Sequence, residues 1–412
     1  MRTESQPSHE NGRPLNILTF TSLFPNAVSP THGVFILQRI ANLAQLGHRV
    51  TVVAPVPYVP SFLGRWKQTS AIPRQEEIAG LEVHHPRYAL IPKVSMPFHG
   101  RLIYAGATRL VERLHKERKF DLVDAHYVYP DGFAGVKLAQ HLGIPSVVSA
   151  RGTDINLFPT FRTIRPQIKW TLDQARQVVA VSKGLKQKVV ELGIPLEKLR
   201  VIGNGIDPAK FRPQDRVESR ARLGIPSDAQ VAICVAGLVG AKGHSYLLEA
   251  AALLAKKLPK LRMYFVGKGV LLQQLREKSL ALGIVDRLQF AGSRPHDELQ
   301  YWFSAADVSC LISLREGCPN VVAESLACGC PVIGSDIPGI KELVCNEQLG
   351  ILVQRNSSAV AKSLESAFAK KWDRKAISDS MAGKTWTDVA RQVETVFLQA
   401  LTAAPNKVGE GE

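Results

Sequence analysis

The stretch HGVFILQRIANLAQLGHRVTVVAP, residues 32–55, has the pattern of an amphipathic helix that runs into a buried strand. Its apolar side chains recur at helical spacing on Ile36, Ile40, Leu43 and Leu46. Gly47 is of the residue type that ends a helix, and the apolar run at 50–54 is typical of a strand in a parallel sheet. Because another buried run, LNILTFTSLFP, precedes the stretch at 15–25, the sequence predicts a strand-helix-strand unit here.

The same alternation continues on both sides of a break near the middle of the chain. Helices are expected at 101–119, 134–142 and 183–192, with strands at 122–125, 146–149 and 177–181. Farther along, strands are expected at 230–236, 262–266, 288–290 and 308–312, with helices at 245–257, 271–282 and 296–305. This pattern predicts the α/β class, with two doubly wound, Rossmann-like domains whose carboxyl strand ends face a central ligand cleft.

The break is the segment LEKLRVIGNGIDPAKFRP, residues 196–213, in which glycine and proline are concentrated. We therefore place the domain boundary there, with one domain at 15–203 and the other at 204–385. A final helix at 386–402 is expected to return toward the first domain. Flexible tails are expected at 1–14 and 403–412.

Composition limits the class of protein. Of the 412 residues, 45% are hydrophobic and 21% are charged, which fits a soluble globular protein and excludes a disordered or membrane-embedded chain. No apolar run approaches the roughly 20 residues that cross a bilayer, and the first fourteen residues contain no apolar signal core. A cytoplasmic location is expected.

The basic charge belongs mainly to the first half. Residues 1–200 carry 26 Lys and Arg against 14 Asp and Glu, whereas residues 201–412 carry 26 against 22. This asymmetry suggests nucleic acid or an anionic membrane surface as a partner, and an ordinary basic surface is the alternative. A nucleic-acid partner is not expected, because no recognition motif or interleaved aromatic pattern is present. Cys328 and Cys330 lack a second spaced pair, so no metal site is expected either.

The block REGCPNVVAESLACGCPVIGSDIPGIKELV, residues 315–344, is the most informative for chemistry. A helix that starts near Pro319 would present the N–H groups of Asn320, Val321 and Val322 to a diphosphate. Glu316 would then lie on the preceding loop and Glu324 about one turn inside the helix, one suited to sugar hydroxyls and the other to a ribose. Two solvated glutamates that flank a helix start are the alternative.

This block resembles the signature of the family 4 glycosyltransferases, a retaining group with the two-domain GT-B fold. The matching motifs are E-G-x-P-N-V-x-x-E-S-L-A-x-G-x-P-V-I at 316–333 and D-I-P-G-x-x-E-L-V at 336–344. The resemblance implies that Glu324 contacts the ribose and Glu316 the sugar hydroxyls. It also implies an acceptor-side domain at 15–203, a nucleotide-sugar-binding domain at 204–385 and no metal or other cofactor. Within the family, it points to bacterial polysaccharide biosynthesis of the teichuronic acid type.

A second motif agrees less completely. The segment from Ala236 to Gly243 resembles the family's G-R-L-x-x-x-K-G loop, in which Arg and Lys neutralise the donor diphosphate. Lys242 matches, but Gly237 occupies the arginine position. Loss of one charge-assisted contact to phosphate costs about 1.5 to 3 kcal/mol. Arg151 or another residue across the cleft is a candidate replacement.

Three segments of the first half also resemble family elements. Gly33 lies in a glycine-bearing loop where the backbone would approach the donor phosphates, with a plain turn as the alternative. His126 ends a predicted strand near the place of the reacting sugar, and a buried structural histidine is the alternative. In SARGTD, residues 149–154, Arg151 takes the place of the family's histidine, and Asp154 either orients the acceptor or holds the loop.

The expected activity is therefore a retaining transfer of a sugar from a nucleotide-diphosphate sugar to a polysaccharide or lipid-linked glycan, with His126, Glu316 and Lys242 as catalytic residues. The alternatives are a weak or non-catalytic nucleotide-sugar or glycan-binding protein and a nucleotide-sugar 2-epimerase. Dinucleotide, ATP and esterase motifs are absent from the sequence.

The basic helix expected at 101–119, together with the loop at 65–67, suggests peripheral binding to an anionic inner-membrane face. Ordinary core packing with a solvated basic face is the alternative. The apolar side of this helix is expected at 102, 103, 110, 111 and 114.

Overall fold

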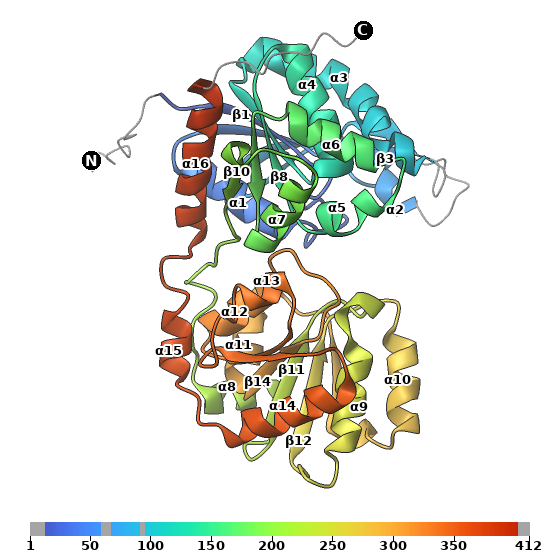
Figure 1. Cartoon of the computed structure of the whole chain (residues 1–412), viewed down its shortest axis with the longest axis vertical. Helices are drawn as coiled ribbons and strands as arrows, with labels where there is room; N and C mark the ends of the chain where they lie inside the picture. The colour runs from blue at the N-terminus through green and yellow to red at the C-terminus, as the bar shows by residue number, and fades with distance from the viewer. Residues whose placement is uncertain (1–12, 59–66, 91–94, 403–412) are drawn as a thin grey trace. The chain divides into compact units, whose positions relative to one another are not determined.

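The computed structural model describes residues 13–58, 67–90 and 95–402 (Figure 1). The chain divides into two compact units, one that ends at Gly205 and resumes at Trp386, and one from Ile206 to Thr385. The expected flexible tails at 1–14 and 403–412 lie outside the described residues, apart from Arg13 and Pro14, as do residues 65 and 66 of the basic loop.

The first unit is built on an eight-stranded sheet in the order β10-β9-β8-β7-β1-β2-β5-β4. All neighbours are parallel except β4 and β5, which are antiparallel. The strands are β1 (Asn16–Phe20), β2 (Arg49–Val53), β4 (Gln75–Ile78), β5 (Leu81–His84), β7 (Leu122–His126), β8 (Ser146–Ala150), β9 (Gln177–Ala180) and β10 (Leu199–Val201). Two further short strands, β3 (Val56–Tyr58) and β6 (Arg87–Ala89), pair with each other.

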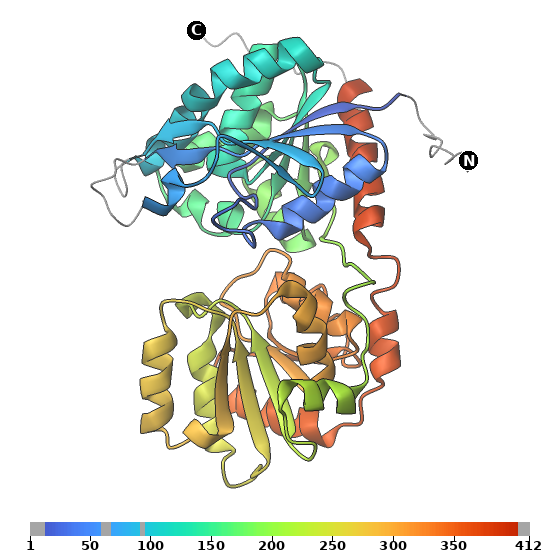
Figure 2. The ribbon, with the colours of Figure 1, turned by 180° about the vertical axis from the view of Figure 1, so that it is seen from behind.

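Helices of the first unit cover this sheet (Figures 1 and 2). They are α1 (Val34–Gln45), α2 (Lys67–Ser70), α3 (His99–Arg118), α4 (Phe133–Leu142), α5 (Thr153–Asn156), α6 (Arg165–Gln174), α7 (Lys183–Glu191) and α16 (Trp386–Thr402). Helix α16 packs beside α1, and its buried side chains Val393 and Phe397 share a core cluster with Ile36 and Ile40 of α1. The apolar side chains predicted at helical spacing in residues 32–55 thus lie on the buried face of α1.

The buried face of α3 differs from the prediction. Ile103, Val111 and Leu114 are buried as expected, but the stripe is completed by Gly100 and Ala107. Leu102 and Leu110, which were expected to be buried, are only partly covered. The reason is that small residues also occupy the contact side of a helix where it lies close to its neighbour, so hydrophobicity alone places the stripe too far round the helix.

The second unit contains a six-stranded, all-parallel sheet in the order β13-β12-β11-β14-β15-β16. Its strands are β11 (Gln230–Val235), β12 (Leu261–Val266), β13 (Leu288–Gly292), β14 (Val308–Leu311), β15 (Val332–Ser335) and β16 (Gly350–Val353). Its helices are α8 (Arg216–Leu223), α9 (His244–Leu253), α10 (Leu272–Ala281), α11 (Leu299–Ala305), α12 (Asn320–Ala327), α13 (Pro338–Lys341), α14 (Ser357–Ala369) and α15 (Arg374–Asp379).

The strand order reverses direction once in each sheet, between β1 and β7 in the first unit and between β11 and β14 in the second. This arrangement confirms the α/β class with two doubly wound, Rossmann-like units. Ligands of such sheets bind outside the carboxyl ends of the strands at the reversal point. A ligand site is therefore expected in the loops that follow these four strands.

Two element boundaries were wrong. The helix expected at 245–257 ends at Leu253, and the helix expected at 296–305 begins with a short 3₁₀ turn, His296–Glu298, before α11. Proline at 319 caps α12 instead of forming its first turn, because its extended backbone lies outside the helical region.

No helix in the described ranges has the length and apolar character needed to cross a membrane.

Candidate active site

Two loops of the second unit meet at the reversal point between β11 and β14. Lys242 ends a 3₁₀ turn, Gly240–Lys242, after β11, and Glu316 lies in the loop after β14. The Nζ of Lys242 donates to Oε1 of Glu316 over 2.6 Å, and the backbone N–H of Leu314 donates to the carbonyl of Ala241 over 2.7 Å. The structure therefore brings together two of the three predicted catalytic residues as an ion pair.

The tight turn after Lys242 explains how this contact is reached. Gly243 has a φ of 70°, and a Cβ atom there would lie 2.1 Å from the carbonyl oxygen of Ile312. Only glycine allows the chain after β11 to pass so close to the end of β14. The close passage fixes Lys242 opposite Glu316.

Helix α12 begins at Asn320, directly after the Glu316 loop. The N–H of Val322 already donates to the carbonyl of Pro319 over 3.1 Å, so the expectation of three free amides is wrong. A tightened first turn is common at helix starts. The positive end of the helix dipole, with the amides of Asn320 and Val321, still faces the loop that carries Glu316.

Glu324 is buried, with 6% of its surface exposed. Its Oε1 accepts a hydrogen bond from Nε2 of His296 over 2.9 Å, and the imidazole packs edge-on against Phe211, with ring centroids 4.9 Å apart. The two glutamates of the motif thus face different partners, Lys242 for Glu316 and His296 for Glu324. Sequence reasoning missed His296, whose position before a helix start resembled an ordinary surface residue.

Gly237 has space around it. A Cβ atom there would meet nothing nearer than the carbonyl oxygen of Lys268 at 3.8 Å, and its φ is not in the left-handed region. Nothing in the local backbone therefore requires glycine at the position where the family motif has arginine. A Cβ atom is therefore accommodated at this exposed position.

In the first unit, the predicted residues gather at the ends of β1, β7 and β8. His126 is the last residue of β7 and is completely buried. Its Nε2 bonds to Oδ2 of Asp124 over 2.9 Å, and its Nδ1 accepts from a guanidinium N–H of Arg151. Burial lowers the pKa of His126 to about 3, against the attraction of Asp124. In this state the neutral imidazole has both nitrogens engaged, which also fits the structural alternative for this histidine.

Asp124 and Arg39 extend this network into the core. Burial by itself would raise the pKa of Asp124, but His126 and the Arg39 guanidinium outweigh it and lower the pKa to about 2. Arg39, which is 1% exposed, donates to Ser149 over 2.9 Å and lies 3.5 Å from Asp124. An arginine on the buried face of α1 thus neutralises the carboxylate that holds His126.

Arg151 directly follows β8 and contacts two neighbouring segments. Its Nη1 donates to Oδ1 of Asn204 over 3.1 Å, and its guanidinium carbon lies 5.4 Å from the ring centroid of Phe35 at the start of α1. These contacts hold the side chain beside His126 within the first unit.

Asp154 holds the loop after β8. Its carboxylate accepts backbone N–H groups of Val128, Arg151 and Gly152 over 2.7 to 3.1 Å, and it is completely buried. Burial raises the pKa of Asp154, although these N–H groups oppose the rise. Of its two expected roles, the contacts present are those of the loop anchor.

The glycine at position 33 caps α1 with a φ of 67°. A Cβ atom there would lie 2.2 Å from the carbonyl oxygen of Leu23. Glycine is thus required because the backbone at position 33 passes close to the loop that follows β1. The start of α1 lies at the same edge of the sheet as His126.

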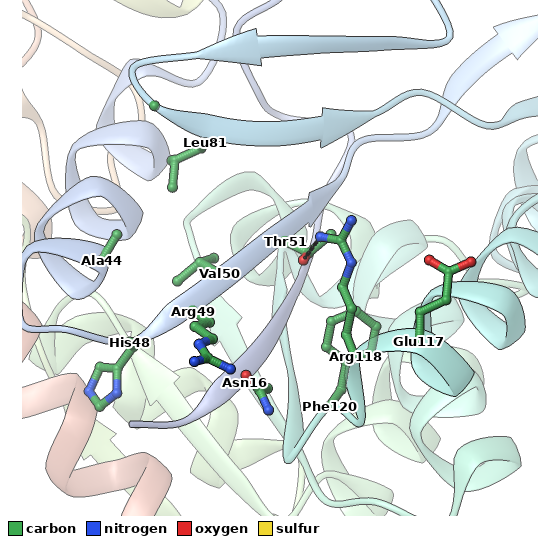
Figure 3. Close-up of a pocket in the computed structure, with 11 residues that line it drawn as sticks. Asn16, Ala44, His48, Arg49, Val50, Thr51, Leu81, Glu117, Arg118 and Phe120 are labelled. Carbon is green, nitrogen blue, oxygen red and sulfur yellow. Dashed lines mark hydrogen bonds between the residues drawn. The ribbon is translucent and has the colours of Figure 1, made fainter. Parts of the chain in front are cut away.

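A cavity of about 440 Å³ lies elsewhere in the first unit (Figure 3). It is lined by the first residues of β1, β2 and β5, and by Arg118, whose guanidinium donates to Thr51. These are the amino ends of the strands, so the cavity lies at the opposite edge of the sheet from His126.

In the described residues, no group of three or more His, Cys, Asp or Glu side chains is placed to hold a metal ion.

Comparison with known proteins identifies the class. Residues 32–210 match the model of Glycosyltransferase Family 4, and residues 215–381 match that of Glycosyl transferases group 1. The chain therefore belongs to the family 4 glycosyltransferases and is a glycosyltransferase of the GT-B type. The resemblance found in the sequence is thereby confirmed, as is the expectation of an enzyme of this class.

Individual relatives agree over most of their length. The chain is 29% identical over 360 residues to the putative teichuronic acid biosynthesis glycosyltransferase TuaC of Bacillus subtilis, covering 85% of this chain and 88% of the relative. It is 25% identical over 407 residues to the D-inositol 3-phosphate glycosyltransferase of Thermobispora bispora, covering 92% of each.

Solved structures share the fold. Sucrose-phosphate synthase from Thermosynechococcus elongatus superposes with a TM-score of 0.77 at 20% identity, over 95% of this chain and all of the other. Anabaena HepE in complex with UDP superposes with a TM-score of 0.71 at 20% identity, over 94% of this chain and all of the other.

Proposed function

We propose that this glycosyltransferase transfers a sugar, with retention of its anomeric configuration, from a nucleotide-diphosphate sugar to a polysaccharide or lipid-linked glycan. The observation that carries the proposal is the Lys242–Glu316 pair beside the start of α12, at the reversal point of the second sheet. A related structure of the same fold contains UDP, which supports a nucleotide-linked donor. The relative named for teichuronic acid biosynthesis supports a polysaccharide product.

The pair gives the site a way to respond to the donor. Without donor, the charge of Lys242 is balanced by Glu316. A diphosphate at the start of α12 would compete for the ammonium group, because two phosphates carry more charge than one carboxylate. Glu316 would then be released to accept hydrogen bonds from sugar hydroxyls. Exchange of partners thus assembles both donor contacts in one step.

Cleavage of the anomeric bond leaves negative charge on the departing diphosphate. Lys242 and the amides at the start of α12 would stabilise that charge in a site shielded from water. Glu316 is assigned to the sugar hydroxyls, so the leaving phosphate itself is proposed to take the proton of the acceptor hydroxyl. The proposal needs no resident metal or other cofactor, since Lys242 and the helix start supply the positive charge.

Glu324 is proposed to bind the ribose hydroxyls. Its Oε1 is held by His296, which leaves the rest of the carboxylate to accept bonds from a diol. His126, with Arg151 beside it, is proposed to lie near the transferred sugar. To donate a hydrogen bond to a sugar hydroxyl, the imidazole of His126 would have to break its bond to Asp124. To accept a hydrogen bond from a sugar hydroxyl, it would have to break its bond to Arg151.

A second candidate is a nucleotide-sugar-binding protein without strong transferase activity. Gly237 favours it, because one of the two cations of the family's phosphate loop is absent. The decisive experiment is a thermal-shift screen of nucleotide sugars, followed by product analysis with a lipid-linked acceptor. Donor binding with glycan product supports the transferase, donor binding without product supports the second candidate, and no donor binding rejects both.

The enzyme is further proposed to work in the cytoplasm, peripherally at the inner membrane face. The solvent side of α3 carries Arg101, Arg109 and Arg113 at multiples of four residues, followed by Lys116, and all four are exposed. Side chains at this spacing lie in one row along a helix. Each cation near an anionic surface contributes about 1 kcal/mol of binding.

A further inference from the structure

Three aromatic rings form a row that starts next to His126 and reaches solvent. The ring of Tyr127 packs edge-on against Phe158 with centroids 5.8 Å apart, and Phe158 contacts Phe161 at 6.3 Å. Phe161 is 40% exposed, whereas Tyr127 and Phe158 are half-buried. The row lies in the segments that follow β7 and β8, around α5 and the start of α6 (Figure 1).

The backbone fixes the inner end of this row. Tyr127 has a φ of 77°, a left-handed conformation that a bulky side chain rarely adopts. The conformation is held because the N–H of Tyr127 donates to Ser149 and that of Val128 donates to the buried carboxylate of Asp154. Rare backbone conformations that are held in place by surrounding contacts are concentrated at functional sites. Here the outlier is the residue that directly follows His126 in the chain.

The outer end of the row is strongly basic. Residues 155–172 contain Arg162, Arg165 and Lys169 and no carboxylate, and of these three cations only Lys169 forms an ion pair, with Asp173 over 2.8 Å, among the described residues. Arg162 and Arg165 are exposed, and neither side chain has a hydrogen-bond or ion-pair partner among the described residues. The backbone N–H of Arg165 donates to the carbonyl of Phe161, so arginine and ring belong to one turn. This surface therefore combines apolar rings with uncompensated positive charge.

We propose that this surface, formed by Tyr127, Phe158, Phe161, Arg162 and Arg165, binds an anionic glycan as the acceptor. The proposal rests on the proposed transferase function and specifies its acceptor class. The C–H face of a pyranose ring carries partial positive charge and packs on the negative face of an aromatic ring. A carboxylate or phosphate on the same glycan matches the planar guanidinium groups.

A lipid surface is the competing occupant, because Phe98 is also exposed and its loop is joined to α6 through the bond from Gln167 to the carbonyl of Pro97. The direction of the ring row favours a glycan. Exposure falls from Phe161 to the half-buried Phe158 and Tyr127, and Tyr127 directly follows His126 in the chain, whereas membrane-inserted rings would all be exposed. The two occupants also predict different roles for Phe98.

The test is calorimetric titration of the full chain with two soluble tetrasaccharides, without donor. One alternates glucuronic acid with N-acetylglucosamine, and the other, chitotetraose, is neutral. We expect the acidic sugar to bind at least about fivefold more tightly. Arg162→Ala with Arg165→Ala should abolish this preference, and Phe161→Ala should weaken binding of both sugars about threefold or more.

Two control variants separate the explanations. Arg276→Ala removes an exposed cation of α10 in the second unit and should change neither titration. Phe98→Ala should also leave both unchanged. Equal affinity for the two sugars, absence of binding, or equal losses in Phe98→Ala and Phe161→Ala would overturn the proposal. Because donor is absent, these outcomes are independent of whether the second unit binds a nucleotide sugar, which the donor screen tests separately.

Discussion

The Nζ of Lys242 lies 2.6 Å from Oε1 of Glu316, across the reversal point between β11 and β14. Both side chains are largely covered, at 27% and 11% exposed, so their attraction is screened less than that of a surface pair. A donor diphosphate must break this contact to reach the lysine. The affinity for donor therefore depends on the difference between the ionic contact that lysine makes with phosphate and the one it makes with Glu316.

Lys242→Ala should weaken binding of a nucleotide-diphosphate sugar by about tenfold to a hundredfold, because a charge-assisted contact to phosphate is lost and Glu316 is left uncompensated beside it. Adding Glu316→Gln should restore part of the affinity. Calorimetry on the single and double variants measures this coupling. Lys256→Ala, at an exposed lysine of the same unit, is the control. Purely additive losses would contradict the partner exchange.

Glu324→Ala should abolish detectable donor binding while leaving the fold intact. The physical reason is that the variant removes the proposed ribose contact and releases His296. Glu277→Ala, at an exposed glutamate of α10 in the same unit, is the carboxylate control. Circular dichroism checks the fold and calorimetry the affinity. An affinity within twofold of the unaltered protein would show that the ribose is bound elsewhere.

Gly237→Arg should strengthen donor binding, because the position is open and the added guanidinium would supply the second cation of the phosphate loop. The expected gain is about tenfold, which corresponds to 1.4 kcal/mol for one charge-assisted contact. Gly237→Gln controls for side-chain bulk. If the arginine variant folds normally and binds donor no better, another cation already occupies this part of the site.

Asp131 gives the first unit a specific pH dependence. It is completely buried and accepts bonds from Ser22, and burial raises its pKa to about 7. Between the unfolded value near 4 and the folded value near 7, the folded state holds the extra proton. This group's contribution to stability is therefore complete below pH 4 and is lost as the pH rises to 7.

Asp131→Asn should remove that loss, since an amide keeps an acceptor for Ser22 without a buried charge. Urea unfolding at pH 5 and pH 8 measures the free energy of unfolding of both proteins. Relative to the unaltered protein, the variant should gain about 1 to 3 kcal/mol more at pH 8 than at pH 5. A difference that is the same at both pH values would place the pKa of Asp131 outside this window.

Flotation with vesicles tests the basic row of α3. Binding to anionic vesicles at low salt should be lost when Arg101, Arg109 and Arg113 are replaced by Glu, and should weaken with added salt. Neutral vesicles should bind poorly in every case. The control replaces exposed cations of the second unit, Lys256 and Arg276. Equally poor flotation with both vesicle types would favour a soluble acceptor.

Periodicity was sufficient to predict the two α/β sheets, because a parallel strand buried on both faces and an amphipathic helix leave strong local patterns. It also placed Lys242 after the strand expected at 230–236 and Glu316 after the one expected at 308–312, but it did not predict that these two strands are neighbours. Contacts that depend on long-range packing were not predictable. The bond from His296 to Glu324 joins residues 28 positions apart. Arg39 and Asp124 are 85 positions apart, and Arg39 is the one charged residue on the otherwise apolar buried face of α1.

The return of α16 to the first unit has a consequence for synthesis. Residues 206–385, the whole second unit, leave the ribosome before Trp386 does, so this unit can complete its sheet while the first still lacks a helix. Until α16 arrives, the core cluster that contains Ile36 and Ile40 of α1 lacks the apolar side chains of α16. The unit translated first is therefore the one finished last, and during that interval it is the part of the chain most exposed to aggregation and most dependent on chaperones.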